Sequence, residues 1–424
     1  MYKRQFYGRI NYSFKNRYLL TFTLRGDATS RFSKDNRWGV FPAVALGWKI
    51  NDEAFMADAA TVLSDLKLRL GWGQTGQQDV GSYNNYTMTY SISQPGSYYP
   101  GMSGWLYPYF PNAINPDLKW ETTTTWNVGV DYGFLNNRIT GSVEAYIRDT
   151  DDLLSTVEVA AGGSTVNRLP QNIGSMRNYG VEFAINARPI VTNDFTWNLS
   201  YNIGWNHNEI TDLHGLSFET GGGFGGTGGD CQIQKEGYPL YTYYLYQQVY
   251  DEAGKPIEGA YVDQNGDGII DGNDRIAGKS ALPKVTMTFG SNFRYKQWDL
   301  GFSLRASLGN YNYASSIRGG TATDGVFRNG YTNLFESDVY FVGNENYSDY
   351  WVRNASFLRC DNITLGYTFD PLIHNRLNLR LFASVQNPFV ITKYAGVDPE
   401  VSSGVDGNIY PRSTTWSLGL SASF

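Results

Sequence analysis

The sequence predicts an all-β protein, specifically an antiparallel transmembrane β-barrel. Three observations indicate this class. Apolar and polar residues alternate with a period of two, the alternating stretches are about ten residues long or longer, and aromatic residues (16%) are nearly as common as charged residues (17%). Strands of soluble proteins are usually about 5 or 6 residues long, whereas a tilted strand that crosses a bilayer needs roughly 9 to 11. A soluble sandwich also alternates, so strand length is what favours the barrel.

The first predicted strand pair lies in residues 5–25, with a turn at Lys15 and Asn16. Alternate side chains of both arms are apolar, which is typical of a hairpin with one apolar face. The residues predicted to share that face are Phe6, Gly8, Ile10, Tyr12, Phe14, Tyr18, Leu20, Phe22 and Leu24.

The same alternation returns along the rest of the chain. Apolar rows occur within 126–134, 139–147, 197–205, 298–308 and 416–424. None of these rows carries a charged residue, as expected because Arg or Lys at mid-bilayer costs about 2 to 4 kcal/mol. Asp131, Glu144 and Arg148 fall on the opposite face. The apolar rows are therefore predicted to contact lipid and the polar rows to line a lumen.

Connection lengths predict the orientation, because outer-membrane barrels have short periplasmic turns and long external loops. Short connections are predicted at 15–16, 135–137, 190–195, 295–297 and 371–376, with a somewhat longer one at 51–64. Long connections are predicted between them, at 26–37, 75–119, 149–177, 207–282, 309–354 and 388–410. This alternation gives about thirteen strands. An odd number of antiparallel strands cannot close by an antiparallel pair, so we expect residues 1–424 to form part of a larger barrel.

Several function classes are disfavoured by composition. The net charge is −6 with no Lys/Arg cluster, so the phosphate-neutralising patch of a nucleic-acid-binding protein is missing. Cys231 and Cys360 have no C-x-x-C spacing, and the three histidines accompany no catalytic motif. The stretch at 223–228 matches G-x-G-x-x-G but follows no strand of a βαβ unit. We therefore expect neither catalytic residues nor an enzyme.

Residues 263–275, "DQNGDGIIDGNDR", resemble a calcium loop, with oxygen-bearing side chains at alternate positions and a central glycine. The predicted ligands are Asp263, Asn265, Asp267, the Ile269 carbonyl, Asp271 and Asp274. An aspartate stands where an EF-hand has its bidentate glutamate, and no amphipathic helices flank the loop. A polar, glycine-rich turn without an ion is the alternative. Calcium, if bound, would stiffen an external loop.

The predicted loop at 75–119 contains a cluster of aromatic residues in "PGSYYPGMSGWLYPYFPN". Exposed aromatic rings there could stack on sugar rings or cover a peptide, and burial against neighbouring loops or a partner protein is the alternative. The candidate substrate-binding residues are Tyr98, Tyr99, Trp105, Tyr107, Tyr109 and Phe110.

Several motifs, in this order along nearly the whole chain, resemble the SusC/RagA family of TonB-dependent outer-membrane transporters. They include "GRINYSFKNRYLLTFTLRGDATSRFSKDNRWGVFPAVALGWKINDEAFM", "LSDLKLRLGWGQTGQ", "NIGSMRNYGVEFAIN", "FLRCDNITLGYTF", "LRLFASVQNPFVITKYAGVDPEV" and "YPRSTTWSLGLSASF". The resemblance implies a 22-stranded barrel, of which this chain would be strands 10 to 22. It also implies a plug domain, a TonB box and first barrel strands, all expected upstream of residue 1.

The resemblance further implies a function and its partners. The chain would be the barrel of a transporter in the cell outer membrane that imports oligosaccharides, or less often peptides. Its partners would be a SusD-like surface lipoprotein, TonB with ExbB and ExbD, and outer-membrane lipid. Two alternatives remain: a passive porin-like channel, and a secreted calcium-binding β-rich protein.

Overall fold

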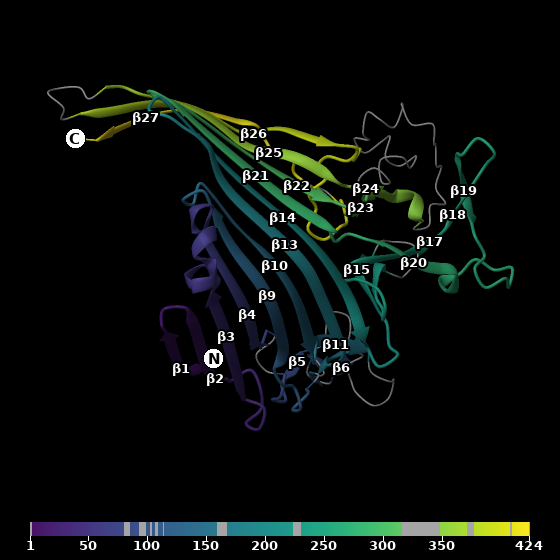
Figure 1. The fold of residues 1–424 in the computed structure, drawn as a ribbon. Helices are drawn as coiled ribbons and strands as arrows, with labels where there is room; N and C mark the ends of the chain where they lie inside the picture. The colour runs from purple at the N-terminus through teal and green to yellow at the C-terminus, as the bar shows by residue number, and fades with distance from the viewer. Residues whose placement is uncertain are drawn as a thin grey trace.

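The computed structural model shows a single large antiparallel sheet with elaborated loops at one end (Figure 1). It describes residues 2–79, 85–92, 99–101, 104–106, 109–112, 114–158, 168–223, 230–315, 348–370, 377–407 and 409–423. No helix among them is long and apolar enough to cross a membrane.

The sheet has thirteen strands, as predicted, and each pairs with its neighbour in chain order. Its strands are β1 (Lys3–Phe14), β2 (Tyr18–Thr29), β3 (Trp38–Lys49), β4 (Leu63–Gln77), β9 (Glu121–Phe134), β10 (Ile139–Asp151), β13 (Ser175–Val191), β14 (Phe195–Asp212), β21 (Val285–Tyr295), β22 (Trp298–Leu308), β25 (Phe357–Thr368), β26 (Asn378–Thr392) and β27 (Thr415–Ser423). They are 9 to 18 residues long, which is sufficient to cross a bilayer. Among the described residues β1 pairs only with β2, and β27 only with β26. The sheet is thus a curved, open wall.

Strand register brings the predicted apolar residues into continuous rows across the sheet. One row consists of Ile10, Phe22, Val44, Trp72, Trp126 and Ile147, on six successive strands. No second sheet covers this row in the described structure, since Ile10 is 64% and Trp126 59% exposed. The apolar rows are therefore the lipid-facing surface of a barrel wall and not the core of a sandwich.

Aromatic residues mark the strand ends beside the short turns. Tyr18 and Trp48 stack at 6.4 Å between ring centroids, and Trp298 meets Tyr367 edge-on at 4.8 Å. Such aromatic girdles are typical of the membrane–water interface of outer-membrane barrels. This end is therefore the edge of the lipid-facing band.

The alternation of short and long connections is also confirmed. The turns after β1 and β9 use residues in the left-handed region, with φ of 55° at Asn16 and 56° at Asn136, a conformation that asparagine tolerates better than most residues. Residues 371–376 lie outside the described part, but the strands on both sides, β25 and β26, pair directly. Between β3 and β4 lie two short 3₁₀ helices, η1 (Ile50–Asp52) and η2 (Ala54–Thr61).

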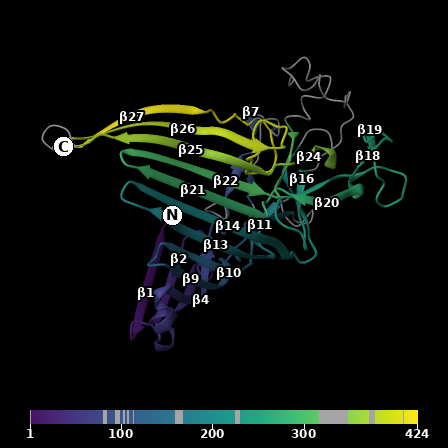
Figure 2. The same cartoon turned by 45° about the horizontal axis from the view of Figure 1, so that its top comes forward.

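The long connections contain short strands of their own, and they gather at one end of the sheet (Figures 1 and 2). These strands are β5 (Tyr90–Ile92), β6 (Tyr99–Gly101), β7 (Gly104–Leu106), β8 (Tyr109–Pro111), β11 (Leu154–Glu158), β12 (Arg168–Asn172), β15 (Phe218–Gly223), β16 (Asp230–Gln234), β17 (Thr242–Tyr246), β18 (Gln248–Tyr250), β19 (Pro256–Tyr261), β20 (Arg275–Ser280), β23 (Tyr311–Tyr313) and β24 (Val352–Asn354).

Two long connections share a small hydrophobic core, and Val405 of a third packs against it. Its buried members are Cys231, Tyr243, Leu245, Tyr313, Trp351 and Val352. The hydroxyl of Tyr243 lies 2.6 Å from the carbonyl oxygen of Gly404 and 2.9 Å from that of Tyr311. Burial raises the pKa of Tyr243 above its ordinary value, so this side chain stays neutral and donates. Connections that are far apart in sequence are thus tied into one folded platform.

Candidate functional site

The polar face of the sheet is the candidate functional surface, and its charged side chains occur in clusters. In the middle of the wall, Arg69 on β4 lies 2.9 Å from Asp131 on β9 and 3.1 Å from Glu144 on β10. Glu144 also accepts a hydrogen bond of 2.7 Å from the Asn127 amide. We call Arg69, Asp131 and Glu144 the wall cluster. All three side chains come from strands that are adjacent in the sheet and are about 30% exposed.

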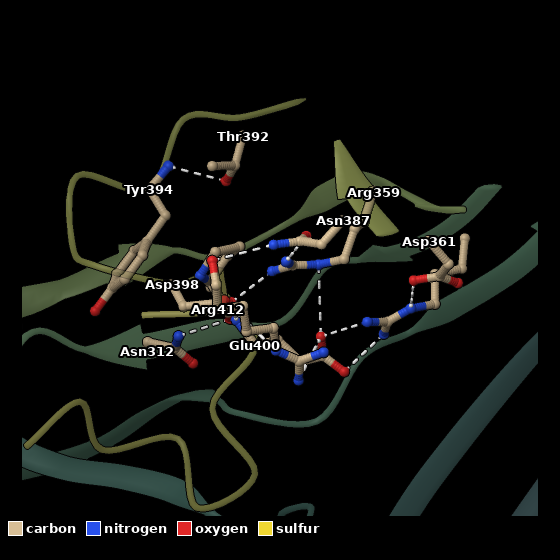
Figure 3. A network of polar contacts seen from close by, with 12 residues as sticks. Asn312, Arg359, Asp361, Asn387, Thr392, Tyr394, Asp398, Glu400 and Arg412 are labelled. Carbon is tan, nitrogen blue, oxygen red and sulfur yellow. Dashed lines mark hydrogen bonds and ion pairs between the residues drawn. The ribbon is translucent and has the colours of Figure 1, made fainter. Parts of the chain in front are cut away.

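A larger cluster of polar contacts lies near the ends of β22 and β25 that lead into the long loops, and Figure 3 shows it from close by. We call it the latch cluster, and its members are Arg305, Arg359, Asp361, Asp398, Glu400 and Arg412. Three guanidinium groups thus face three carboxylates. Arg305 on β22 holds both carboxylate oxygens of Glu400, at 2.6 and 2.7 Å. Its Nε donates to Asp361 at 2.7 Å.

Arg359 on β25 is the buried centre of the latch cluster. Its side chain is 2% exposed, and that of its partner Asp398 is 6% exposed. Arg359 donates to Asp398 at 2.6 Å and to the Asn387 side chain at 2.7 Å. Asp398, Glu400 and Arg412 all lie in the connection between β26 and β27, where Arg412 is 3.0 Å from Glu400. The cluster therefore fastens residues 393–414 to the inner face of the wall.

A β-bulge gives the latch its geometry. The pairing of β22 with β25 shifts between Ser303 and Leu304, whose partners are Asn362 and Cys360, and this leaves Asp361 as the extra residue. A bulge of this kind bends the strand and redirects a side chain, and here Asp361 meets Arg305. Opposite the bulge, Asn387 is in the left-handed region with φ of 49°. The bulge thus places Asp361 and Asn387 beside the two arginines.

The ionisation of Glu400 follows from its arginine partners. Burial would raise the pKa of this carboxyl, but the hydrogen bond from Arg305 and the nearby charges of Arg305, Arg412 and Arg359 outweigh that effect. The pKa of Glu400 is lowered below its ordinary value. Glu400 is therefore anionic at neutral pH and holds three guanidinium groups together.

The comparison with known families identifies this wall. The family model for the β-barrel of TonB-dependent receptor-like proteins matches residues 2–388. The chain belongs to this family. Its place is accordingly the outer membrane, as the sequence predicted.

Individual relatives support a SusC/RagA-like receptor. The chain is 52% identical to the TonB-dependent receptor SusC of Bacteroides thetaiotaomicron and 31% identical to the TonB-dependent receptor P39 of Formosa agariphila, each over 99% of its length. A solved structure of the RagAB peptide transporter superposes on 100% of the chain with a TM-score of 0.83 at 26% identity. The chain spans 43%, 46% and 48% of these proteins respectively. All three are described as receptors or transporters, in agreement with the expectation that the chain is not an enzyme.

The aromatic residues predicted to contact substrate are only partly described in the receptor. Tyr98 and Tyr107 lie outside the described residues, as do residues 224–228 of the glycine-rich stretch at 223–228. Tyr99 begins β6, Trp105 lies in β7, and Tyr109 and Phe110 lie in β8. The side chain of Tyr109 is 68% exposed. Substrate contact by these residues stays a prediction.

The predicted calcium loop is a self-bonded turn in the receptor. Asp263 accepts the backbone N–H groups of Gly266 and Gly268 at 2.7 and 2.8 Å. Asp274 accepts those of Asp271 and Gln264, both at 2.8 Å. The bond from Asp271 is the main reason why the pKa of Asp274 is lowered.

The donor set of this loop is compatible with a hard cation but is not gathered around one point. Asp267 bonds the Ile269 N–H, Asp271 caps the turn at Asn273, and Asn265 bonds Asp267. Each carboxylate oxygen has a second lone pair that can still accept a hydrogen bond or bind a cation. However, no group of three or more His, Cys, Asp or Glu side chains in the described structure is placed to hold a metal ion. Calcium binding stays a prediction.

The latch cluster could not be recognised from the sequence alone. The segment "YAGVDPEV" contains Asp398 and Glu400, but it served only as evidence of family resemblance. No spacing rule connects Arg359 to a carboxylate 39 residues further on. The available signal was two acids, Asp398 and Glu400, on either side of a proline in a loop that also carries Arg412.

Proposed function

We propose that the chain forms the barrel wall and loop platform of a TonB-dependent importer in the outer membrane. The observation that carries this proposal is the separation of the sheet's two faces. Apolar rows continue from strand to strand on one face, and the wall and latch clusters lie on the other. Such a wall has lipid on one side and a hydrated lumen on the other.

The partners follow from the family. A SusD-like surface lipoprotein would dock at the loop end, and TonB with ExbB and ExbD would supply energy. The folded loop platform supports this assignment, because its buried core gives a partner a preformed surface. The role of the chain itself would be to enclose the substrate path.

We propose oligosaccharides as the substrate class and peptides as the competing class. The higher identity is to SusC, at 52%, whereas the RagAB structure described as a peptide transporter is 26% identical. Near the short turns, the polar face has a pocket of about 360 Å³ lined by Asn186, Asn198 and Asn292 among others. Amides both donate and accept hydrogen bonds, as a sugar hydroxyl requires.

Uptake in cells tests the proposal. Deleting the gene should abolish uptake of the cognate labelled oligosaccharide, and the full-length gene should restore it. A protonophore should stop uptake by an energised importer but not diffusion through a passive channel. Uptake that survives the protonophore would replace the importer with a porin-like channel.

Matched lysine substitutions on β9 test the two faces. Val128→Lys places a charge in lipid and should cost about 2 to 4 kcal/mol of barrel stability. Thr125→Lys, on the polar face of the same strand, should be tolerated. Equal stability of the two variants in detergent-solubilised full-length receptor would contradict the assignment of the faces.

Two further roles are part of this proposal. Calcium in the loop at 263–274 would act as scaffolding, supported by the oxygen-rich turn that ends in the 3₁₀ helix η3 (Gly272–Asp274). The aromatic cluster of the loop predicted at 75–119 would contact substrate, and the exposed ring of Tyr109 supports this role.

A further inference from the structure

A second polar pocket adjoins the latch cluster on the lumen face. It encloses about 540 Å³ between β25, β26 and residues 410–415. This volume falls within the roughly 300–1,000 Å³ that is usual for small-molecule sites. The side chains that matter for recognition are Arg359, Asn362, Gln386, Asn387, Tyr410 and Arg412.

The latch cluster makes one side of this pocket rigid. Arg359 is fixed by Asp398 and Asn387, and the Asn387 amide donates in turn to the backbone oxygen of Arg412 at 3.1 Å. The Asn362 amide donates to Ser303 at 2.9 Å. Groups held in this way lose little conformational entropy when a ligand binds.

Two side chains of the pocket are free to meet a ligand. The ring of Tyr410 is 89% exposed, and Gln386 is exposed on β26. Neither side chain has a hydrogen-bond partner within the described part of the chain. An exposed aromatic ring beside an unbonded amide combines a stacking surface with a group that both donates and accepts.

The charge balance selects among ligand classes. The three arginines of the latch are matched by three carboxylates, so the pocket has no unpaired charge for a peptide terminus or an acidic group. A neutral ligand with many hydroxyls suits it better. Vicinal hydroxyls can bond both atoms of an amide, while the apolar face of the sugar ring covers the tyrosine.

We infer that this pocket is a sugar-binding subsite of the lumen wall, with Tyr410 as its stacking platform and Gln386 as its hydroxyl-binding amide. The inference rests on the proposed function, since it assumes that oligosaccharides enter the lumen. It adds recognition by residues beside the latch cluster to the substrate contact proposed for the aromatic cluster of the loop at 75–119.

Calorimetric titration of the detergent-solubilised full-length receptor tests the subsite. The probes are neutral glucose oligomers with α-1,4 or β-1,4 linkages, a fructose oligomer, and an alanine peptide of similar length. Tyr410→Ala should weaken binding of the recognised oligosaccharide about tenfold, as expected for the loss of one aromatic stack. Gln386→Ala should weaken it about threefold to tenfold. Tyr410→Phe should bind like the parent receptor.

Tyr250→Ala is the matched control, because this half-exposed tyrosine lies in the β18–β19 hairpin and not in the pocket. Parent-like thermal unfolding of each variant establishes that it is folded. Wild-type affinity of both Tyr410→Ala and Gln386→Ala for the bound oligosaccharide would overturn the subsite and leave the importer proposal intact. Binding of the peptide alone by the parent receptor would overturn the sugar assignment itself.

Discussion

The wall cluster and the latch cluster use the same residue types on the same face of the sheet, but they differ in burial and in origin. Arg69, Asp131 and Glu144 come from adjacent strands and keep contact with water. Arg359 and Asp398 are almost fully buried, and the acid comes from a loop. The first cluster neutralises charges that the wall already carries. The second fixes the position of a long connection.

This difference has an energetic consequence. A partly exposed ion pair contributes about 0 to 1 kcal/mol, because water solvates each partner when the other is removed. A buried pair leaves an unsolvated charge when one partner is lost, which costs about 3 to 5 kcal/mol. Substitutions in the latch should therefore be far more damaging than the same substitutions in the wall.

The largest expected effect is that of Arg359→Ala. Asp398 would remain buried without its main partner, and the free energy of unfolding should fall by about 3 to 5 kcal/mol. Denaturant unfolding of the full-length receptor in detergent, followed by tryptophan fluorescence, measures this change. The double variant Arg359→Met with Asp398→Leu should recover most of the loss, because it removes both charges. An unchanged midpoint for Arg359→Ala would show that the latch does not contribute to stability.

A smaller, local effect is expected for Glu400→Gln. The neutral amide keeps the shape of the side chain but removes the charge from its contacts with Arg305, and because Glu400 is about a third exposed, water compensates for part of the loss. Hydrogen exchange in residues 393–414 should accelerate, while exchange in β9 and β10 stays unchanged. Glu144→Gln in the wall cluster is the matched control. Equal protection in the parent and the Glu400→Gln variant would contradict the latch.

Lowering the pH should also open the latch. Because the folded-state pKa of Glu400 is lowered, its contribution is present above its ordinary pKa and is lost as the pH falls through the lower, folded-state value. Protection of residues 393–414 should therefore decline below about pH 4. Hydrogen exchange at a series of pH values, corrected for intrinsic rates, measures the decline. Glu400→Gln should remove this pH dependence, and a variant that retains all of it would assign the titration to another group.

A minor effect is expected for Arg69→Ala in the wall cluster. Asp131 and Glu144 keep about 30% of their side-chain surface in water, so the free energy of unfolding should change by no more than about 1 kcal/mol. The same unfolding experiment measures it. A loss as large as that of Arg359→Ala would mean that burial does not explain the difference between the clusters.

The smallest effect on the wall is expected from calcium removal. If the loop at 263–274 holds calcium, a chelator should speed trypsin cleavage near Arg275 several-fold and leave the unfolding midpoint of the barrel unchanged. Trypsin should cleave the Asp267→Asn variant rapidly near Arg275, with or without chelator. Identical cleavage of the parent receptor in both conditions would remove calcium from the proposal.

The strands could be predicted from the sequence because their signal is local. A side chain two positions along a strand lies on the same face, so the alternation from Trp126 to Phe134 specified both the strand and its lipid-facing side. The asparagine turn at 136–137 and the lengths of the connections were equally local. All of these predictions are confirmed by the pairing of β9 with β10 and of its neighbours.

The loops could not be predicted in the same way. The structure ties Tyr243 to Gly404, 161 residues away, and Arg359 to Asp398. Each contact depends on where a long connection returns to the sheet. The spacing of residues in the sequence does not predict that position. The pocket beside Tyr410 has the same origin, since its lining residues come from β25, β26 and the end of the last long connection with the first residue of β27.

The sequence by itself determined a two-faced wall of thirteen strands, because a period of two places every side chain on one face or the other. Only the tertiary structure decided which charges meet, because the bulge brings Asp361 to Arg305 and the return of residues 393–414 brings Glu400 to the same side chain. The physical reason is that strand faces depend on neighbours a few residues away. Ion pairs that fasten a loop depend on the whole folded path between their partners.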